Sequence, residues 1–143
     1  MSFDVSSYMK SESFIEDRIR WRAGIGGLPN ENTYFWEAGE KPEVTLPKEI
    51  GKPVLVSVAS KNELIVICTR GAAVKNPEEE SCFLYSNIAE VQDKKVYRDE
   101  KKEELRRIEV HFVDGGNVSI SPEPFGPAFS IWNILLMLQR MSS

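Results

Sequence analysis

The chain has 143 residues, of which 41% are hydrophobic and 28% are charged, and its formal net charge is −4. This composition is typical of one globular domain and excludes a disordered chain or a membrane protein. The acidic balance disfavours nucleic acid as the main partner, because phosphate backbones are bound by clustered lysine and arginine. Met1 to Lys10 has neither a basic start nor an apolar stretch. We therefore expect a cytoplasmic protein, without a transmembrane segment.

A first helix is predicted from Phe14 to Ala23, where Ser11 or Ser13 is suited to cap its N-terminus. Its apolar residues do not fall on one clean stripe. The Gly24-Ile25-Gly26-Gly27 segment that follows is superficially like a phosphate-binding loop. It comes after a helix instead of a strand, and no lysine motif follows it, so we interpret it as a helix stop and a turn.

An extended arm is predicted between this helix and Pro53, because glycine and proline interrupt the chain repeatedly. Only Thr33 to Trp36 and Glu43 to Leu46 are candidates for short strands. The aromatic side chains of the arm would be costly to leave in water. We therefore divide the chain into residues 1–53, a helix and arm packed on the body, and residues 54–143, the body itself.

The body begins with two strands of β-branched residues, Val54 to Ala59 and Leu64 to Thr69, which lie at hairpin spacing. Every residue from Leu64 to Cys68 is apolar, which predicts a strand covered on both faces. Gly71 to Val74 continues this strand or opens the next one.

Further short strands are expected at Cys82 to Tyr85 and at Ile88 to Gln92. The stretch from Arg107 to Val113 alternates apolar and polar residues, as a half-buried strand does. Asp114 to Asn117 then gives a strong signal for a tight turn.

One tract has an unusual composition: of the fifteen residues from Asp93 to Arg107, seven are basic and five are acidic. The mixed signs are typical of a solvated loop or the tip of a long hairpin. The alternative is a docking surface for a charged partner, with Tyr97 and Arg98 as its contact residues.

The terminal helix, Gly126 to Met141, is apolar over about two-thirds of its circumference. A helix that merely caps a β-rich body buries about half of itself, so something must cover the rest. Two candidates remain open, the N-terminal arm and a second copy in a homodimer. The side chains involved are expected to be Trp21, Phe35 and Trp36 from the arm, and Trp132 and Leu136 on the helix as partner-binding residues.

Catalytic and metal chemistry have little support in the sequence. The single histidine, His111, shares a strand face with Glu109, and neither Cys68 nor Cys82 has the spacing of a zinc site. Both cysteines lie in apolar runs and are expected to be buried free thiols. Carboxylates are expected to be solvated, the clearest being Glu78, Glu79, Glu80, Glu103 and Glu104. We predict no catalytic residues, cofactor or metal.

Three segments and the terminal helix together resemble the bacterial pleckstrin-homology-like (PH-like) domains. The segments are Glu63 to Gly71, Phe83 to Val91, and Ile108 to Ile120 with its Asp114-Gly115 turn. The resemblance, which covers about Val54 to Met141, implies an α+β, mostly antiparallel fold. In it two near-orthogonal sheets form a barrel capped by the C-terminal helix, and the role is binding or scaffolding.

The sequence thus favours a non-enzymatic interaction module with a protein or peptide partner. The alternatives are a module that binds lipid headgroups at a membrane surface and, third, a small enzyme. Phosphoinositide-binding members of the fold carry several basic residues in the first hairpin, whereas Ala59 to Leu64 offers only Lys61 beside Glu63. One ammonium group cannot neutralise a multiply charged headgroup, so we predict no specific phosphoinositide binding.

Overall fold

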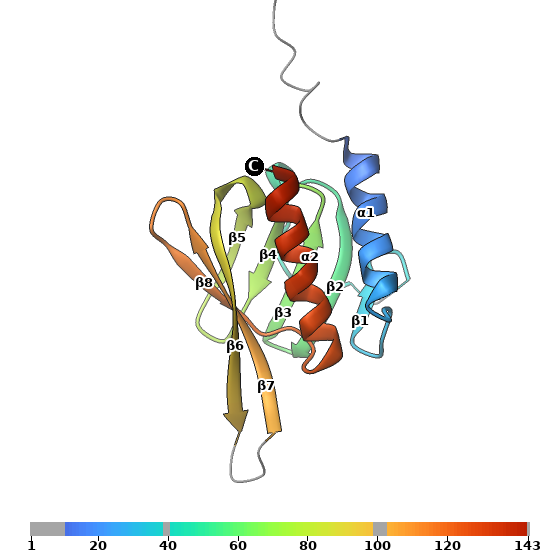
Figure 1. The fold of residues 1–143 in the computed structure, drawn as a ribbon. Helices are drawn as coiled ribbons and strands as arrows, with labels where there is room; N and C mark the ends of the chain where they lie inside the picture. The colour runs from blue at the N-terminus through green and yellow to red at the C-terminus, as the bar shows by residue number, and fades with distance from the viewer. Residues whose placement is uncertain (1–10, 39–40, 99–102, 143) are drawn as a thin grey trace, which may run out of the picture.

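The computed structural model describes residues 11–38, 41–98 and 103–142, with the strand backbone alone for 94–98 and 103–106. It is an α+β structure in which two antiparallel sheets combine with one helix from each end of the chain (Figure 1). Its elements are α1 (Glu12–Ile25), β1 (Thr33–Phe35), η2 (Lys48–Ile50), β2 (Pro53–Ser60), β3 (Glu63–Cys68), β4 (Gly71–Lys75), β5 (Glu80–Leu84), η3 (Tyr85–Asn87), β6 (Ile88–Arg98), β7 (Glu103–Phe112), β8 (Asn117–Ile120) and α2 (Gly126–Ser142).

The larger sheet has five strands in the order β1-β2-β3-β4-β5. Strands β2 and β3 form the predicted hairpin, and β4 is a strand of its own. The prediction that Leu64 to Cys68 is covered on both faces is confirmed, since all five side chains are buried. Alternate residues belong to two separate apolar clusters, with Ile65 and Ile67 on the helix side and Leu64 and Val66 on the other.

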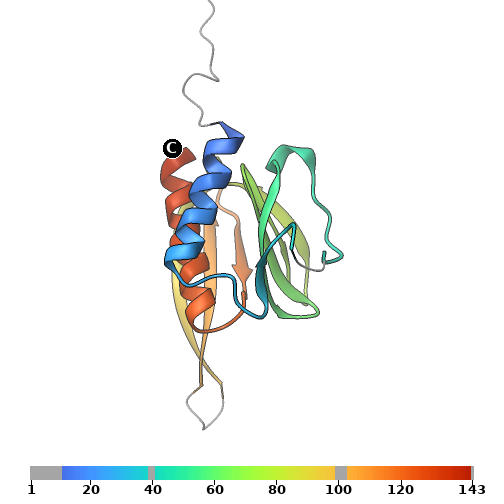
Figure 2. The same cartoon turned by 90° about the vertical axis from the view of Figure 1, so that its right-hand side faces the viewer.

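The arm covers the face of this sheet that is turned away from the helices (Figure 2). Tyr34 and Trp36 pack there with Val44 and Leu46, whereas Phe35, one residue out of phase, packs with the main core. The predicted strand at Glu43 to Leu46 is wrong. This segment lies between prolines and meets the sheet through side chains, without ladder hydrogen bonds to it.

The smaller sheet has three strands in the order β6-β7-β8. The predicted tight turn joins β7 to β8, with Gly115 at a φ of 99° and Asp114 Oδ1 accepting a hydrogen bond from the Gly116 amide. Strands β6 and β7 extend into the charged tract as a hairpin that projects beyond the body (Figure 1). The hairpin prediction is therefore confirmed, while its tip lies outside the described residues.

The expected barrel is corrected, because the described strands remain two open sheets. Helix α2 packs against β6, β7 and α1, and its buried side chains join both sheets in one core. The general prediction of a mostly antiparallel α+β fold with a helix at each end is confirmed. Within the described part of the chain, no helix combines the length and apolarity needed to cross a membrane.

Candidate functional site

Helix α1 presents three stripes of side chains, each at the i, i+4, i+8 spacing of one helix face. One stripe enters the core, one contacts the sheet through polar groups, and one faces α2 and solvent. In that order they are Ile15, Ile19 and Ala23; Glu12, Glu16 and Arg20; and Phe14, Arg18 and Arg22, with Trp21 beside the last. This division explains why the apolar residues of α1 form no single clean stripe in the sequence.

The ends of α1 are defined by local chemistry. Ser11, one of the two predicted caps, accepts a hydrogen bond from the Phe14 amide at 3.2 Å. The helix continues two residues past its predicted end, to Ile25, and Gly26 caps it. Gly26 lies against Ser130 of α2, so closely that a Cβ there would collide with Ser130 Oγ. Gly24 is therefore not the helix stop that the sequence predicted, and the predicted turn is confirmed for Gly26 and Gly27.

The polar stripe of α1 fastens the helix to the sheet. Glu12 Oε1 accepts hydrogen bonds from Thr69 Oγ1 at 2.8 Å and from the Lys52 amide at 3.2 Å. Glu16 pairs with Lys52 Nζ at 3.0 Å and with Arg20 at 3.1 Å. The hydrogen bond from Lys52 is the largest cause of a lowered pKa of Glu16; burial opposes it and Arg20 supports it.

A second fastening is a closed ring of hydrogen bonds around Glu123, a buried carboxylate that sequence reasoning missed. Thr33 Oγ1 donates to Glu123 Oε1 at 2.6 Å, and the Glu123 amide donates to Ser57 Oγ at 2.9 Å. Because Thr33 has one hydroxyl proton, Ser57 must donate across the 2.8 Å contact between the two hydroxyls. Asn30 Nδ2 donates to the other carboxylate oxygen at 3.0 Å. The ring ties the arm, β2 and the approach to α2 together.

Beyond these fastenings, α1 and α2 lie side by side (Figures 1 and 2). Side chains from both helices line a groove between their outward faces. The cavity measures about 590 Å³. Its apolar surface comes from both helices, and arginines stand among the apolar residues. The lining residues are Phe14, Arg18, Trp21, Arg22, Asn133, Leu136, Met137, Arg140 and Met141. We call this surface the α1–α2 groove.

Two aromatic side chains of α1 remain unusually exposed at the groove. Trp21 is 51% exposed and Phe14 is 45% exposed. The Arg18 guanidinium lies over the Trp21 ring, 4.3 Å from its centroid, which holds both side chains at the mouth of the groove. An apolar surface of this kind, rimmed by polar groups, marks an interaction site more often than a plain surface.

Of the two predicted partner-binding residues whose side chains the structure describes, Leu136 lines the groove and Trp132 does not. Trp132 lies on the hairpin side of α2, with Nε1 3.5 Å from the Val91 carbonyl oxygen and its ring 5.8 Å from that of Phe129. Tyr97 and Arg98 belong to β6 by their backbone, but their side chains lie outside the described residues.

The arm residues expected to cover α2 are also separated. Trp21 borders the groove, Phe35 packs in the main core, and Trp36 packs on the opposite face of the larger sheet. The prediction for Trp36 is wrong because strand alternation carries it away from α2. Instead, Ile15, Ile19 and Ala23 supply the buried contact surface of α1.

Of the groove residues of α1, sequence reasoning named Trp21 and missed the other three, although a signal for them exists. Phe14, Arg18, Trp21 and Arg22 follow the i, i+4, i+7, i+8 pattern of a single helix face. A search restricted to apolar periodicity does not find this stripe, because two of its members are arginines.

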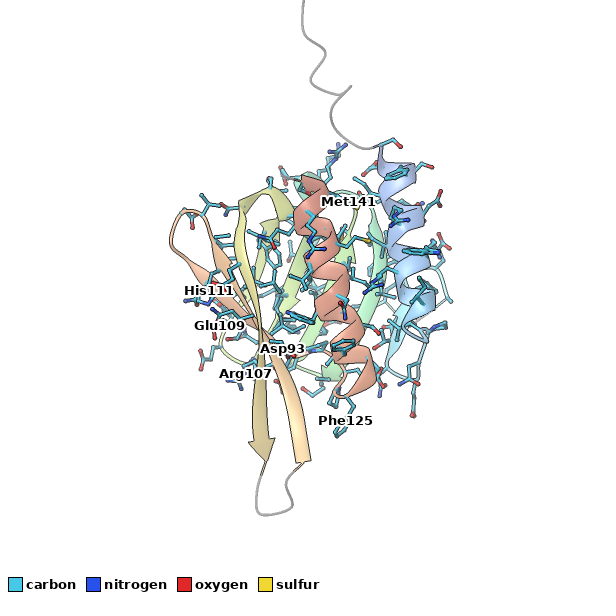
Figure 3. The ribbon with its side chains drawn as sticks, in the orientation of Figure 1. Asp93, Arg107, Glu109, His111, Phe125 and Met141 are labelled. Atoms are coloured by element: carbon cyan, nitrogen blue, oxygen red, sulfur yellow. The ribbon has the colours of Figure 1, made fainter. Side chains whose placement is uncertain are left out.

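The histidine candidate lies far from the groove, on the outer face of the smaller sheet (Figure 3). His111 Nε2 is 3.0 Å from Glu109 Oε1, a contact of ion-pair length whose geometry is not that of a hydrogen bond. The two side chains share a strand face, as expected, while Ile108 and Val110 are buried on the other.

The two cysteines differ. Cys68 is buried, and burial raises the pKa of its thiol to about 12. Cys82 is exposed, which corrects the prediction that both are buried. It lies on β5 at the edge of the larger sheet, where β4 is the one strand paired with it among the described residues. Glu78, Glu79 and Glu80 are exposed as expected, whereas the side chains of Glu103 and Glu104 lie outside the described residues. The described part of the chain contains no cluster of metal-ligating side chains.

Comparison with known protein families, curated proteins and solved structures found no match to this chain.

Proposed function

We propose that this chain is a non-enzymatic, PH-like interaction module that binds a protein or peptide partner in the α1–α2 groove. The observation that carries the proposal is the half-exposed pair Phe14 and Trp21 above an apolar floor of Leu136, Met137 and Met141. Large aromatic side chains at the mouth of a groove are the anchors that dominate protein interfaces.

The fold supports this role in a general way. The fold shares with the PH-like resemblance two antiparallel sheets and a C-terminal helix, without the closed barrel. In this proposal α1 is an addition that converts the outward face of α2 from a bare apolar surface into one wall of a groove.

The chemistry of the remaining candidates favours binding over catalysis. The raised pKa of the buried Cys68 thiol disfavours the thiolate that a nucleophile needs. Glu123 has both carboxylate oxygens engaged by Asn30 and Thr33, which suits a fastening better than a general base. His111 and Glu109 face outward from a sheet instead of lining the groove.

The test is affinity enrichment from the native host with three baits: the unmodified chain, Trp21→Glu, and Ile25→Glu as matched control. Ile25 lies on the same helix and is 57% exposed, but it does not line the groove. A partner retained by the unmodified chain and the control and lost by Trp21→Glu, then reproduced with purified components, supports the proposal. Equal retention by all three would contradict it.

A further inference from the structure

The rim of the α1–α2 groove is basic although the chain as a whole is acidic. Arg18 and Arg22 stand on α1 and Arg140 on α2, and none of the nine lining residues is acidic. The net charge of the chain is −4, so the acidic excess lies elsewhere. A positive rim around an apolar floor selects for a ligand that is both apolar and negatively charged.

The arginine nearest the aromatic wall can bind a carboxylate without leaving its place. The Arg18 guanidinium carbon lies over the Trp21 ring, 4.3 Å from its centroid. A guanidinium carries five N–H donors in its plane, more than a contact with one ring can occupy. Because Arg18 lines the groove, a carboxylate bound there can accept hydrogen bonds from two of these donors. Arg22 follows one helical turn later on the same face.

The dimensions of the groove suit a helix. Its lining runs from Phe14 to Arg22 on α1 and from Asn133 to Met141 on α2. Eight residue steps correspond to about 12 Å, or roughly two turns of a third helix. Two packed helices offer ridges and grooves into which a third can fit. A flat vesicle surface, in contrast, would touch the rim and miss the floor at Met137.

Resting on the proposed function, we propose that the α1–α2 groove takes an acidic amphipathic helix of a protein partner. Apolar residues at i, i+3 or i+4, and i+7 would pack on Leu136, Met137 and Trp21. Carboxylates flanking that apolar face would meet Arg18 and Arg22 on the α1 wall.

The test begins with a displayed library of amphipathic helices about 14 residues, or four turns, long. Their apolar positions are fixed, and their polar positions are drawn equally from acidic, basic and neutral residues. Selection on the unmodified chain, with counter-selection on Trp21→Glu, isolates groove-dependent binders. The inference expects these to be enriched in Asp and Glu at the positions flanking the apolar face.

A charge swap then tests the role of the arginines. Arg18→Glu with Arg22→Glu should weaken the selected acidic peptide by about tenfold or more. The same variant should prefer a copy of that peptide in which lysine replaces the acidic residues. Arg107→Glu on β7, which lines a different cavity, should leave both affinities unchanged. Arg18→Gln with Arg22→Gln serves as a control that removes the charges without reversing them. Circular dichroism of each variant shows whether a loss of binding comes from loss of the fold.

The outcomes separate the two proposals. Groove-dependent binders without acidic enrichment, or an absent charge swap, would overturn this inference and leave the proposed function standing. If no binder depends on the groove, this inference fails, and the proposed function is decided by the affinity enrichment with Trp21→Glu and Ile25→Glu. Arginine-dependent pelleting with phosphatidylserine vesicles, without any peptide binder, would assign the rim to lipid and overturn the inference. If the chain sediments as a dimer and Leu136→Glu dissociates it, the groove is occupied by a second copy. That result would also overturn this inference.

Discussion

Two of the contacts between the N-terminal segment and the body differ sharply: the closed ring around Glu123 and the open α1–α2 groove. In the ring, Thr33 and Ser57 are fully buried and both carboxylate oxygens of Glu123 are engaged. In the groove, Trp21 remains half exposed beneath a stacked arginine. The contrast separates a contact that holds the chain together from a surface that is left for another molecule.

The largest expected effect follows from opening the ring with Thr33→Val. This change removes the donor to Glu123 Oε1 and the acceptor for Ser57, leaving a buried carboxylate poorly solvated. We expect a loss of about 3 kcal/mol in the free energy of unfolding, measured with urea. Thr45→Val, at an exposed position, should change it by about 0.5 kcal/mol or less.

If the ring acts as a unit, its members will not be additive. Ser57→Ala alone and Thr33→Val alone each break the same cycle of hydrogen bonds. The double variant should therefore lose clearly less than the sum of the two single losses. Strict additivity would show that the hydroxyl groups act separately.

Two glycines test the packing of α1 on α2, with opposite expected signs. Gly26→Ala forces Ser130 Oγ to move and costs its 3.3 Å hydrogen bond to the Gly26 carbonyl, for a loss of about 1 kcal/mol. Gly24→Ala meets nothing within 4 Å and should stabilise the helix by about 0.5 to 1 kcal/mol. Thermal unfolding measures both; equal shifts would argue against close contact between the helices.

A smaller effect concerns pH and the polar stripe of α1. Since the pKa of Glu16 is lowered from its ordinary value of 4.5, its contribution to stability is present above that pH and is lost as the pH falls. Between neutral pH and pH 3, the free energy of unfolding of Glu16→Gln should fall by about 0.5 kcal/mol less than that of the unmodified chain. Urea titrations at the two pH values measure this difference. Asp17→Asn, exposed on the same helix, serves as control.

The smallest perturbation is chemical labelling of the cysteines. At neutral pH, iodoacetamide should modify the exposed Cys82 and spare Cys68, whose thiol is buried and has a pKa of about 12. Mass spectrometry of the labelled peptides measures the difference. Fast labelling of Cys68 in the folded chain would indicate that the arm opens from the outer face of the sheet.

Much of the fold could be predicted from the sequence, because it depends on signals between residues that are close in the chain. The apolar run of β3, the turn at Asp114 and the Ser11 cap were each predicted from residues adjacent in the chain. The segment from Glu43 to Leu46 was not, since its apolar residues pack by side chains across a distant sheet without forming a strand.

The site was harder to predict from the sequence, because it depends on how two helices far apart in the chain pack together. Leu136 could be chosen from the apolar excess of α2 alone. The α1 wall required knowing that Ile15 faces the core while Phe14 and Arg18, one stripe away, face α2. Buried Glu123 was equally hidden, since its partners lie in segments remote from it in sequence.

The groove as a docking surface is tested most directly by methyl NMR of the methionines on α2. Met137 and Met141 line the groove, whereas Ala73 lies buried on the far side of the larger sheet and serves as reference. On titration with the partner or selected peptide, we expect the Met137 and Met141 methyl resonances to shift and that of Ala73 to stay. Binding that leaves both methionine resonances unchanged would contradict the account.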